Sequence, residues 1–99
     1  MAIPERFRAS IKDELDALVH GERRELMTWV VQYGDHGAVL IEQPDEIWTH
    51  AGSNFVERSD GSAYGLVPLW TTDESPSDLS AEFEIDVHGV ARLSDVHVL

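Results

Sequence analysis

The sequence predicts an α+β domain in which two N-terminal helices pack on one face of a mainly antiparallel sheet of about four to five strands. Three observations predict this fold. Apolar residues recur at helical spacing in the first third of the chain, they alternate with polar residues in a segment near the C-terminus, and dipeptides typical of tight turns separate other apolar segments. Because 99 residues suffice for one hydrophobic core, residues 1–99 are expected to form a single domain.

The first helix is expected to start near Ile3 and to end near Gly21. Pro4 suits the first position of a helix, because its fixed φ is compatible with the helix and its missing N–H is not needed there. Charged side chains fill one face of this segment, and apolar side chains fill the other at a period close to 3.6 residues. The apolar positions are Ile3, Phe7, Ile11, Leu15, Leu18 and Val19.

A second helix is expected over residues 22–33, with Gly34 as its C-terminal stop. Its side chains at the spacing i, i+3, i+4 and i+7 are Leu26, Trp29, Val30 and Tyr33. Residues 38–41 form a short apolar run that favours a buried strand, although its brevity leaves a helical alternative open. Residues 44–51 begin with Pro44 and two acidic residues, which favours a short helical turn ended by Gly52.

A hairpin is expected around Asp60-Gly61, a pair that favours a tight turn between two strands. Residues 55–58 and 62–70 flank this turn, and Pro68 indicates an edge strand or a bulge. Residues 71–78 are polar and contain Pro76, so they are expected to form a loop.

The clearest strand begins at Leu79, where apolar and polar residues start to alternate strictly through Val87. His88-Gly89 favours a turn into a last segment, residues 90–99, whose apolar positions leave its register open. The sheet face away from the helices is expected to be solvated, as is typical of antiparallel sheets with one covered face.

The charge balance is strongly acidic, with 7 basic and 19 acidic residues and a formal net charge of -12. Of these charges, 2 basic and 13 acidic residues lie from Gly34 onward. Direct binding to the nucleic acid backbone is therefore disfavoured, and the excess acts either as solubility charge or as a surface for a cationic partner. The chain has no cysteine, which excludes disulfides and thiolate metal sites, and no long apolar run, so we expect a cytoplasmic protein without membrane contact.

Residues of the last third of the chain resemble a pattern found in a family of small uncharacterised bacterial proteins. The pattern consists of Leu69-Trp70-Thr71, Asp73-Glu74, Ser77-Asp78-Leu79, Glu82 and the terminal His97-Val98-Leu99. Pro76 stands where the pattern has a basic residue, so an ion pair from this loop is not carried over. The resemblance implies homologues, but it implies no activity, substrate or cofactor.

The strongest local anomaly is a run of acidic residues without a basic one between residues 73 and 86. The candidate protein-binding residues are these six carboxylates and a neighbouring tryptophan: Trp70, Asp73, Glu74, Asp78, Glu82, Glu84 and Asp86. One interpretation is a solvent face whose charges deter aggregation, and the other is a surface that docks a basic partner. Trp70, like Trp48 and Trp29, is expected to pack in the core or to anchor a loop, and Asp78 is expected to bind loop amides.

The histidines do not predict a metal site, because no two of them have a recognised ligand spacing. They are His20, His36, His50, His88 and His97. Glu46 and His50 are four residues apart and would share a face of a helical turn, as a general-base pair, as half of a metal site or as surface charge. Nucleophile and phosphate-binding motifs are absent from the sequence, so we expect no catalytic residues and no cofactor. Enzymatic activity is disfavoured but stays open, because catalytic groups meet in space rather than in sequence.

The leading functional hypothesis is a protein-binding module of the immunity or inhibitor type, which uses its acidic second part to dock a basic partner such as a cationic nuclease. The alternative is a small-ligand-binding or enzymatic domain with a pocket on the sheet face, lined by Trp48, His50, Tyr64 and Trp70. A nucleic-acid mimic shares the same acidity. An exposed apolar strip along either helix would permit a homodimer.

Overall fold

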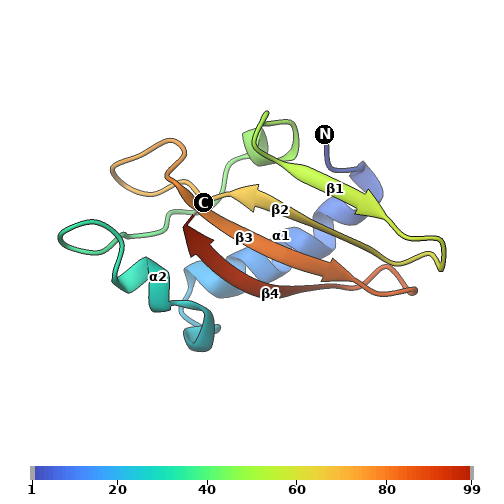
Figure 1. The fold of residues 1–99 in the computed structure, drawn as a ribbon, viewed down its shortest axis with the longest axis horizontal. Helices are drawn as coiled ribbons and strands as arrows, with labels where there is room; N and C mark the ends of the chain where they lie inside the picture. The colour runs from blue at the N-terminus through green and yellow to red at the C-terminus, as the bar shows by residue number, and fades with distance from the viewer. Residues whose placement is uncertain (1, 99) are drawn as a thin grey trace.

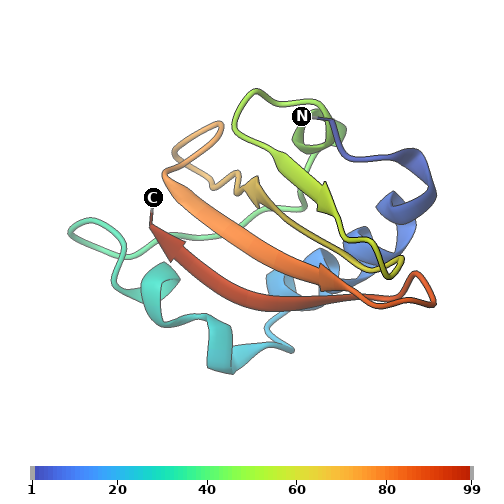
Figure 2. The ribbon, with the colours of Figure 1, turned by 45° about the vertical axis from the view of Figure 1, so that its right-hand side comes forward.

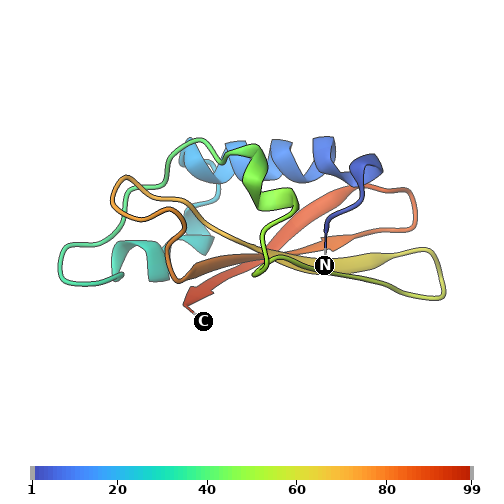
Figure 3. The same ribbon diagram turned by 90° about the horizontal axis from the view of Figure 1, so that it is seen from above.

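The computed structural model describes residues 2–98 and has two layers, a helix layer and a four-stranded antiparallel sheet (Figures 1 and 3). The strands follow one another in the order β1-β2-β3-β4, which confirms the predicted fold class. The helical elements are α1 (Glu5–Val19), η1 (Arg24–Leu26), α2 (Thr28–Val31) and η2 (Asp45–Trp48). The strands are β1 (Asn54–Glu57), β2 (Ala63–Pro68), β3 (Leu79–Ile85) and β4 (Ala91–Val98). Among the described residues no helix combines the length and apolar character that crossing a membrane requires.

The core lies between α1 and the sheet, and both layers contribute residues at the expected period. Helix α1 buries Phe7, Ile11, Leu15 and Leu18. The sheet buries alternate residues of each strand on the same side: Phe55, Ala63, Val67, Leu79, Ala81, Phe83, Ile85, Ala91, Leu93 and Val96. The helical and alternating patterns in the sequence therefore report the two sides of one core.

Helix α1 also covers the outer edge of β4. The Ser10 hydroxyl oxygen accepts a hydrogen bond from the Ala91 N–H at 2.8 Å, and a carboxylate oxygen of Glu14 accepts one from the Leu93 N–H at 3.0 Å. These two N–H groups are two residues apart on an edge strand and point away from β3. Their capping by the helix removes donors that another chain could use to extend the sheet.

The predicted second helix is wrong in length, because residues 22–33 form two short pieces instead of one helix. The η1 turn ends at Met27, and α2 is a single turn in which only Val30 is buried. Thr28, Val30 and Val31 are β-branched and favour helix weakly, so one buried side chain does not sustain a longer helix. Trp29 is 49% exposed, which contradicts the expectation that it packs in the core.

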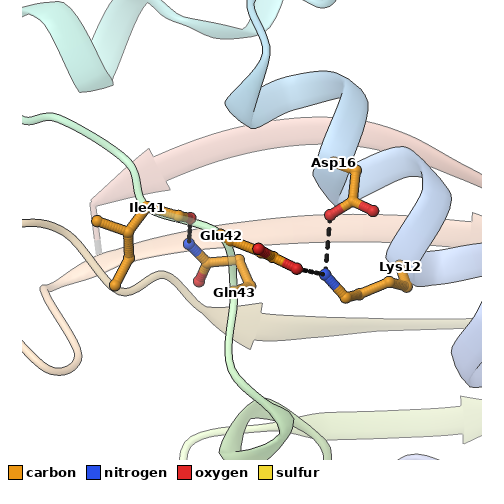
Figure 4. A network of polar contacts seen from close by, with 5 residues as sticks. All are labelled: Lys12, Asp16, Ile41, Glu42 and Gln43. Atoms are coloured by element: carbon orange, nitrogen blue, oxygen red, sulfur yellow. Dashed lines mark hydrogen bonds and ion pairs between the residues drawn. The ribbon is translucent and has the colours of Figure 1, made fainter.

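Residues 38–41 do not form the expected strand. Leu40 makes an isolated antiparallel bridge with Thr71, and Thr72 donates its N–H to the Val39 carbonyl. The connection is instead tied to α1, since Lys12 lies 2.9 Å from Asp16 and 3.3 Å from Glu42 (Figure 4). The short turn expected at residues 44–51 is present as η2, which buries Trp48 as predicted.

The predicted turns are present and fix the register of the meander, which runs β1 to β4 side by side (Figure 2). Gly61 and Gly89 have φ values of +91° and +84°, in the left-handed region that favours glycine. Pro68 is the last residue of β2, whereas the pairing of β2 with β1 already ends at Leu66. Strand β1 therefore has no residue opposite Pro68 that would need the N–H that proline lacks. The bulge lies elsewhere: the register shifts between Glu82 and Phe83, so that Ser94 of β4 has no paired residue in β3.

Candidate functional site on the open face of the sheet

The face of the sheet turned away from α1, which we call the open face, carries the candidate residues Glu82 and Glu84, and the acidic loop adjoins it. Its side chains form rows across the strands, because the pairing sets them opposite one another. One row contains Leu66, Glu82 and Asp95, and a second contains Tyr64, Glu84 and Arg92. A third row joins Ser80 to His97.

The β-bulge explains how β4 contributes to this face. Strict alternation would place Leu93 and Val96, three residues apart, on opposite sides of the sheet. The extra residue, Ser94, restores both to the core, where they are 6% and 2% exposed. It also turns Asp95 and His97 to the open face, next to Glu82.

Glu82, Asp95 and His97 form a close cluster at the centre of the acidic part of the face. His97 Nδ1 lies 3.2 Å from an oxygen of Asp95, and His97 Nε2 lies 4.0 Å from an oxygen of Glu82. The side chains of Glu82 and Asp95 are 45% and 55% exposed, so their charge faces the solvent. This part of the face therefore presents two accessible carboxylates.

The row of Glu84 is electrically balanced by arginines. A carboxylate oxygen of Glu84 lies 2.9 Å from Arg58, and the cross-strand partner of Glu84 in β4 is Arg92. The hydrogen bond from Arg58 to Glu84 raises the pKa of the guanidinium above its ordinary value. The Arg58 guanidinium also lies 4.6 Å from the centre of the Tyr64 ring. Glu84 is therefore less available to a basic partner than Glu82.

Asp86 holds the turn after β3 in place. One of its carboxylate oxygens accepts hydrogen bonds from the Val90 and His88 N–H groups at 3.0 and 2.8 Å. The bond from Val90, helped by that from His88, outweighs burial and lowers the pKa of Asp86. The carboxylate is exposed and ionised, but its first role is structural.

The acidic loop, residues 71–78, adjoins the same end of the sheet as His97 and is fixed from two sides. The Thr71 hydroxyl accepts the N–H groups of Asp73 and Glu74 at 3.3 and 3.0 Å. The Tyr33 hydroxyl donates to Glu74 at 2.6 Å and accepts the Asp78 N–H at 3.1 Å. The bond to Glu74 raises the pKa of Tyr33, against a smaller opposite effect of the Asp78 N–H. Asp73 and Asp78 remain exposed on an ordered loop.

Trp70 anchors this loop from within the core, one of the two roles expected for it. Its side chain is 7% exposed, and its backbone is clamped by buried Gln43, which accepts the Trp70 N–H at 2.8 Å and donates to its carbonyl at 3.0 Å. The ring edge packs against His50, whose Nδ1 accepts the Gly52 N–H at 2.9 Å. The Trp70 ring is therefore covered in this structure and offers a partner little surface.

Ser77 performs the backbone role that the sequence assigned to Asp78. The Ser77 hydroxyl donates to the Leu69 carbonyl at 2.7 Å and accepts the Leu79 N–H at 3.1 Å. Ser77 is buried, whereas the Asp78 side chain points to solvent. The expectation for Asp78 was wrong because both residue types bind loop amides, and burial selected the smaller, uncharged one.

The hollows of the surface differ from the pocket considered from sequence. One, of about 120 Å³, lies on the open face and is lined by Asn54, Tyr64, Gly65, Leu66, Glu82, Phe83, Glu84 and Ser94. Another, of about 380 Å³, lies at the far end and is lined by Arg58, Ser62, Glu84, Ile85, Asp86, Val90 and Arg92. Of the four aromatic and histidine residues considered, only Tyr64 lines either hollow. The hollow beside Tyr64 is smaller than the roughly 300 Å³ at which ligand pockets begin, whereas the hollow beside Arg58 and Arg92 is within that range.

Sequence reasoning missed Asp95 and His97 as site residues. The sequence pointed to Glu46 with His50 as the one pair of a histidine and a carboxylate, whereas the structure brings His97 to carboxylates of its own strand and of β3. The signal available was the Asp95-x-His97 spacing, which places two side chains on one face of a strand.

Comparison with known proteins places the chain in a family. A family model described as a domain of unknown function, DUF7668, matches residues 2–99, far more than the last third on which the sequence resemblance rested. Searches of curated proteins and of solved structures found no match. Because the family model spans nearly the whole chain, the protein belongs to the DUF7668 family of domains of unknown function.

Proposed function

We propose that this domain is a protein-binding module that docks a basic surface of its partner, as an immunity protein or an inhibitor does. The observation that carries the proposal is the composition of the open face, where exposed carboxylates lie beside exposed apolar side chains. Glu82 and Asp95 are cross-strand neighbours, and half-buried Leu66 lies opposite Glu82 on the other side. Such a face suits a partner with Lys or Arg next to an apolar patch.

The apolar part of the proposed surface comes from β1 and β2 rather than from Trp70. Tyr64 is 41% exposed and Val56 is 36% exposed, and they are cross-strand neighbours. Tyrosine is favoured at interfaces, because its ring buries a large area and its hydroxyl still finds a polar partner. Tyr64 therefore takes the anchoring role in the proposed interface.

The electrostatic part of the proposal rests on both local and total charge. Asp78 directly precedes β3 and is an even number of residues from Glu82, so it continues the side of the strand on which Glu82 lies. Asp73 lies exposed on the adjoining loop. With a net charge of -12, the domain attracts a cationic protein at long range, and the accessible carboxylates then pair with it at contact. Association is expected to be fast at low salt and to slow steeply as salt rises.

The test is a capture experiment with matched charge variants. Tagged wild-type protein, a face variant (Glu82→Gln with Asp95→Asn) and a control variant (Asp13→Asn with Glu25→Gln) are incubated with native lysate and washed at low and then high salt. The control removes the same two charges from exposed positions outside the open face. We expect a basic protein that wild type and control retain at low salt and release at high salt, and that the face variant fails to retain.

Equal retention by the face and control variants would contradict docking through the open face. Retention that survives high salt would contradict the electrostatic mechanism. If nucleic acid competes with the domain for binding to the captured protein, the partner surface is a nucleic-acid site. The domain then acts as a nucleic-acid mimic.

A further inference from the structure

The cluster of Glu82, Asp95 and His97 has the composition and spacing of a cation site. Glu82 comes from β3, and the other two residues come from β4 after the bulge. One ligand atom from each residue lies within 4.8 Å of the other two. Two oxygens and one imidazole nitrogen thus converge from two paired strands, on a rigid sheet rather than on a loop.

Two buried polar atoms beside this cluster have no hydrogen-bond partner among residues 2–98. His97 Nδ1 is one of them, because its 3.2 Å approach to Asp95 does not have the geometry of a hydrogen bond. The Ser80 hydroxyl oxygen is the other, in a residue that is 1% exposed. Ser80 is the cross-strand neighbour of His97 and precedes Glu82 by two residues, so it lies on the same face.

These unpartnered atoms point to a missing ligand. A buried polar group without a partner costs about 1–3 kcal/mol, so native structures rarely leave two of them side by side. A cation would take the lone pair of the imidazole nitrogen, and a water bound to that cation would give the Ser80 hydroxyl a partner. Protein groups alone satisfy neither atom within the described chain.

We propose that Glu82, Asp95 and His97 bind a divalent transition-metal cation of the zinc type. Imidazole nitrogen with carboxylate oxygens is a donor set that Zn²⁺ accepts, whereas Mg²⁺ and Ca²⁺ prefer oxygen alone. Bonds of about 2.0–2.1 Å in a tetrahedron separate ligand atoms by about 3.3 Å. The three ligand atoms, now within 4.8 Å of one another, would move closer together when the ion binds, and the fourth position would be left to water.

The site is accessible and electrostatically suited to a cation. Glu82 and Asp95 are 45% and 55% exposed, so an ion reaches their carboxylates directly from solvent, whereas the Nδ1 atom of His97 is buried. Two arginines, Arg58 and Arg92, lie near Glu84 instead: Arg58 forms an ion pair with Glu84, and Arg92 is its cross-strand neighbour. The two carboxylates of the cluster therefore match the charge of a divalent ion.

The test is a titration of the full, tag-free chain with Zn²⁺. Binding is measured by calorimetry and by competition with a chromophoric chelator. We expect one equivalent of Zn²⁺ to bind, and His97→Asn, Glu82→Gln and Asp95→Asn each to weaken binding by at least about 10-fold. His88→Asn and Glu84→Gln serve as matched controls, because these residues lie outside the cluster, and they are expected to bind as the wild type does. Zn²⁺ should also raise the Tm of the wild type and of the two controls, but not the Tm of the three ligand variants.

Three results would overturn the proposal. They are no Zn²⁺ binding, binding that all three ligand variants leave unchanged, and Mg²⁺ or Ca²⁺ competing on equal terms, which would indicate carboxylates acting without the imidazole. Should His97→Asn fail to fold, Glu82→Gln and Asp95→Asn decide the question, because their side chains are about half exposed. The titration uses no protein partner, so its outcome is independent of the docking proposal.

Discussion

Replacing Glu14 by alanine should destabilise the domain through the edge of the sheet. The Glu14 side chain is only 14% exposed and accepts the Leu93 N–H at 3.0 Å and Arg23 at 2.6 Å. It therefore joins α1 to β4 and to the segment after the helix. No other side chain in residues 2–98 is hydrogen-bonded to the Leu93 N–H, so truncation leaves this edge donor bare.

The expected loss follows from the kind of bond removed. A hydrogen bond to a charged group contributes about 1.5–3 kcal/mol, whereas the ion pair with Arg23, which is 35% exposed, adds little. We therefore expect Glu14→Ala to lower the free energy of unfolding by about 2–3 kcal/mol. For a domain of this size each kcal/mol corresponds to a fall in Tm of about 4–8 °C.

The contribution of Glu14 should depend on pH. Burial favours the neutral acid, but the Leu93 N–H and Arg23 outweigh it and lower the pKa of Glu14 below its ordinary value. The stabilisation is therefore fully present above the unfolded-state pKa and is lost as pH falls through the folded-state pKa. The stability difference between wild type and Glu14→Gln should shrink as the pH is lowered through this range.

Urea unfolding followed by circular dichroism measures these differences, with Asp13→Ala as the control on the exposed neighbour. The control should change stability by less than about 0.5 kcal/mol. If Glu14→Ala costs no more than the control, or if the difference from Glu14→Gln grows toward acid pH, the assigned role of Glu14 is wrong.

Three further changes test the packing and the loop. Gly65→Ala should cost about 1–3 kcal/mol, measured by urea unfolding, because an added Cβ would clash with the Asn54 carbonyl oxygen and lie 2.8 Å from the Phe83 ring; an unchanged midpoint would contradict this packing. Ser77→Ala should cost about 1–3 kcal/mol, since it removes the acceptor of the buried Leu79 N–H, whereas the Leu69 carbonyl keeps the Ser77 backbone N–H; a neutral result by thermal unfolding would contradict this role of the hydroxyl. Tyr33→Phe should speed hydrogen exchange of the Asp78 amide several-fold, and an unchanged rate would mean that the hydroxyl does not hold the loop.

The elements that the sequence predicted correctly are those whose periodicity matches a buried face. The apolar positions of α1 and the alternation from Leu79 to Ile85 correspond to side chains that the core buries. The turns at Gly61 and Gly89 were predicted because only glycine adopts a left-handed backbone without strain. Local chemistry was sufficient in these cases.

The second helix was not predictable from its spacing, because spacing does not say how much of a face finds a partner. Trp29 lies at helical spacing from Leu26 and Tyr33, yet it is 49% exposed. The rest of the chain covers only Val30. Tertiary burial, which a pattern of 12 residues does not report, decided the length of α2.

The candidate site was predicted in part, for a reason that lies in the bulge. The carboxylates of β3 could be placed on one face because alternation is local to the strand. Asp95 and His97 reach that face only because Ser94 shifts the register, and register is a property of two strands. The spacing of three between Leu93 and Val96 carries this information once a bulge is considered.

Oxidative footprinting of two aromatic side chains distinguishes docking through the open face from docking elsewhere on the domain. Tyr64 on the open face is 41% exposed, and Trp29 on α2 is 49% exposed, so both react in the free domain. In complex with the captured basic partner, Tyr64 should be protected and Trp29 should react as before. Protection of Trp29 with unchanged reactivity of Tyr64 would move the interface to α2 and contradict docking through the open face.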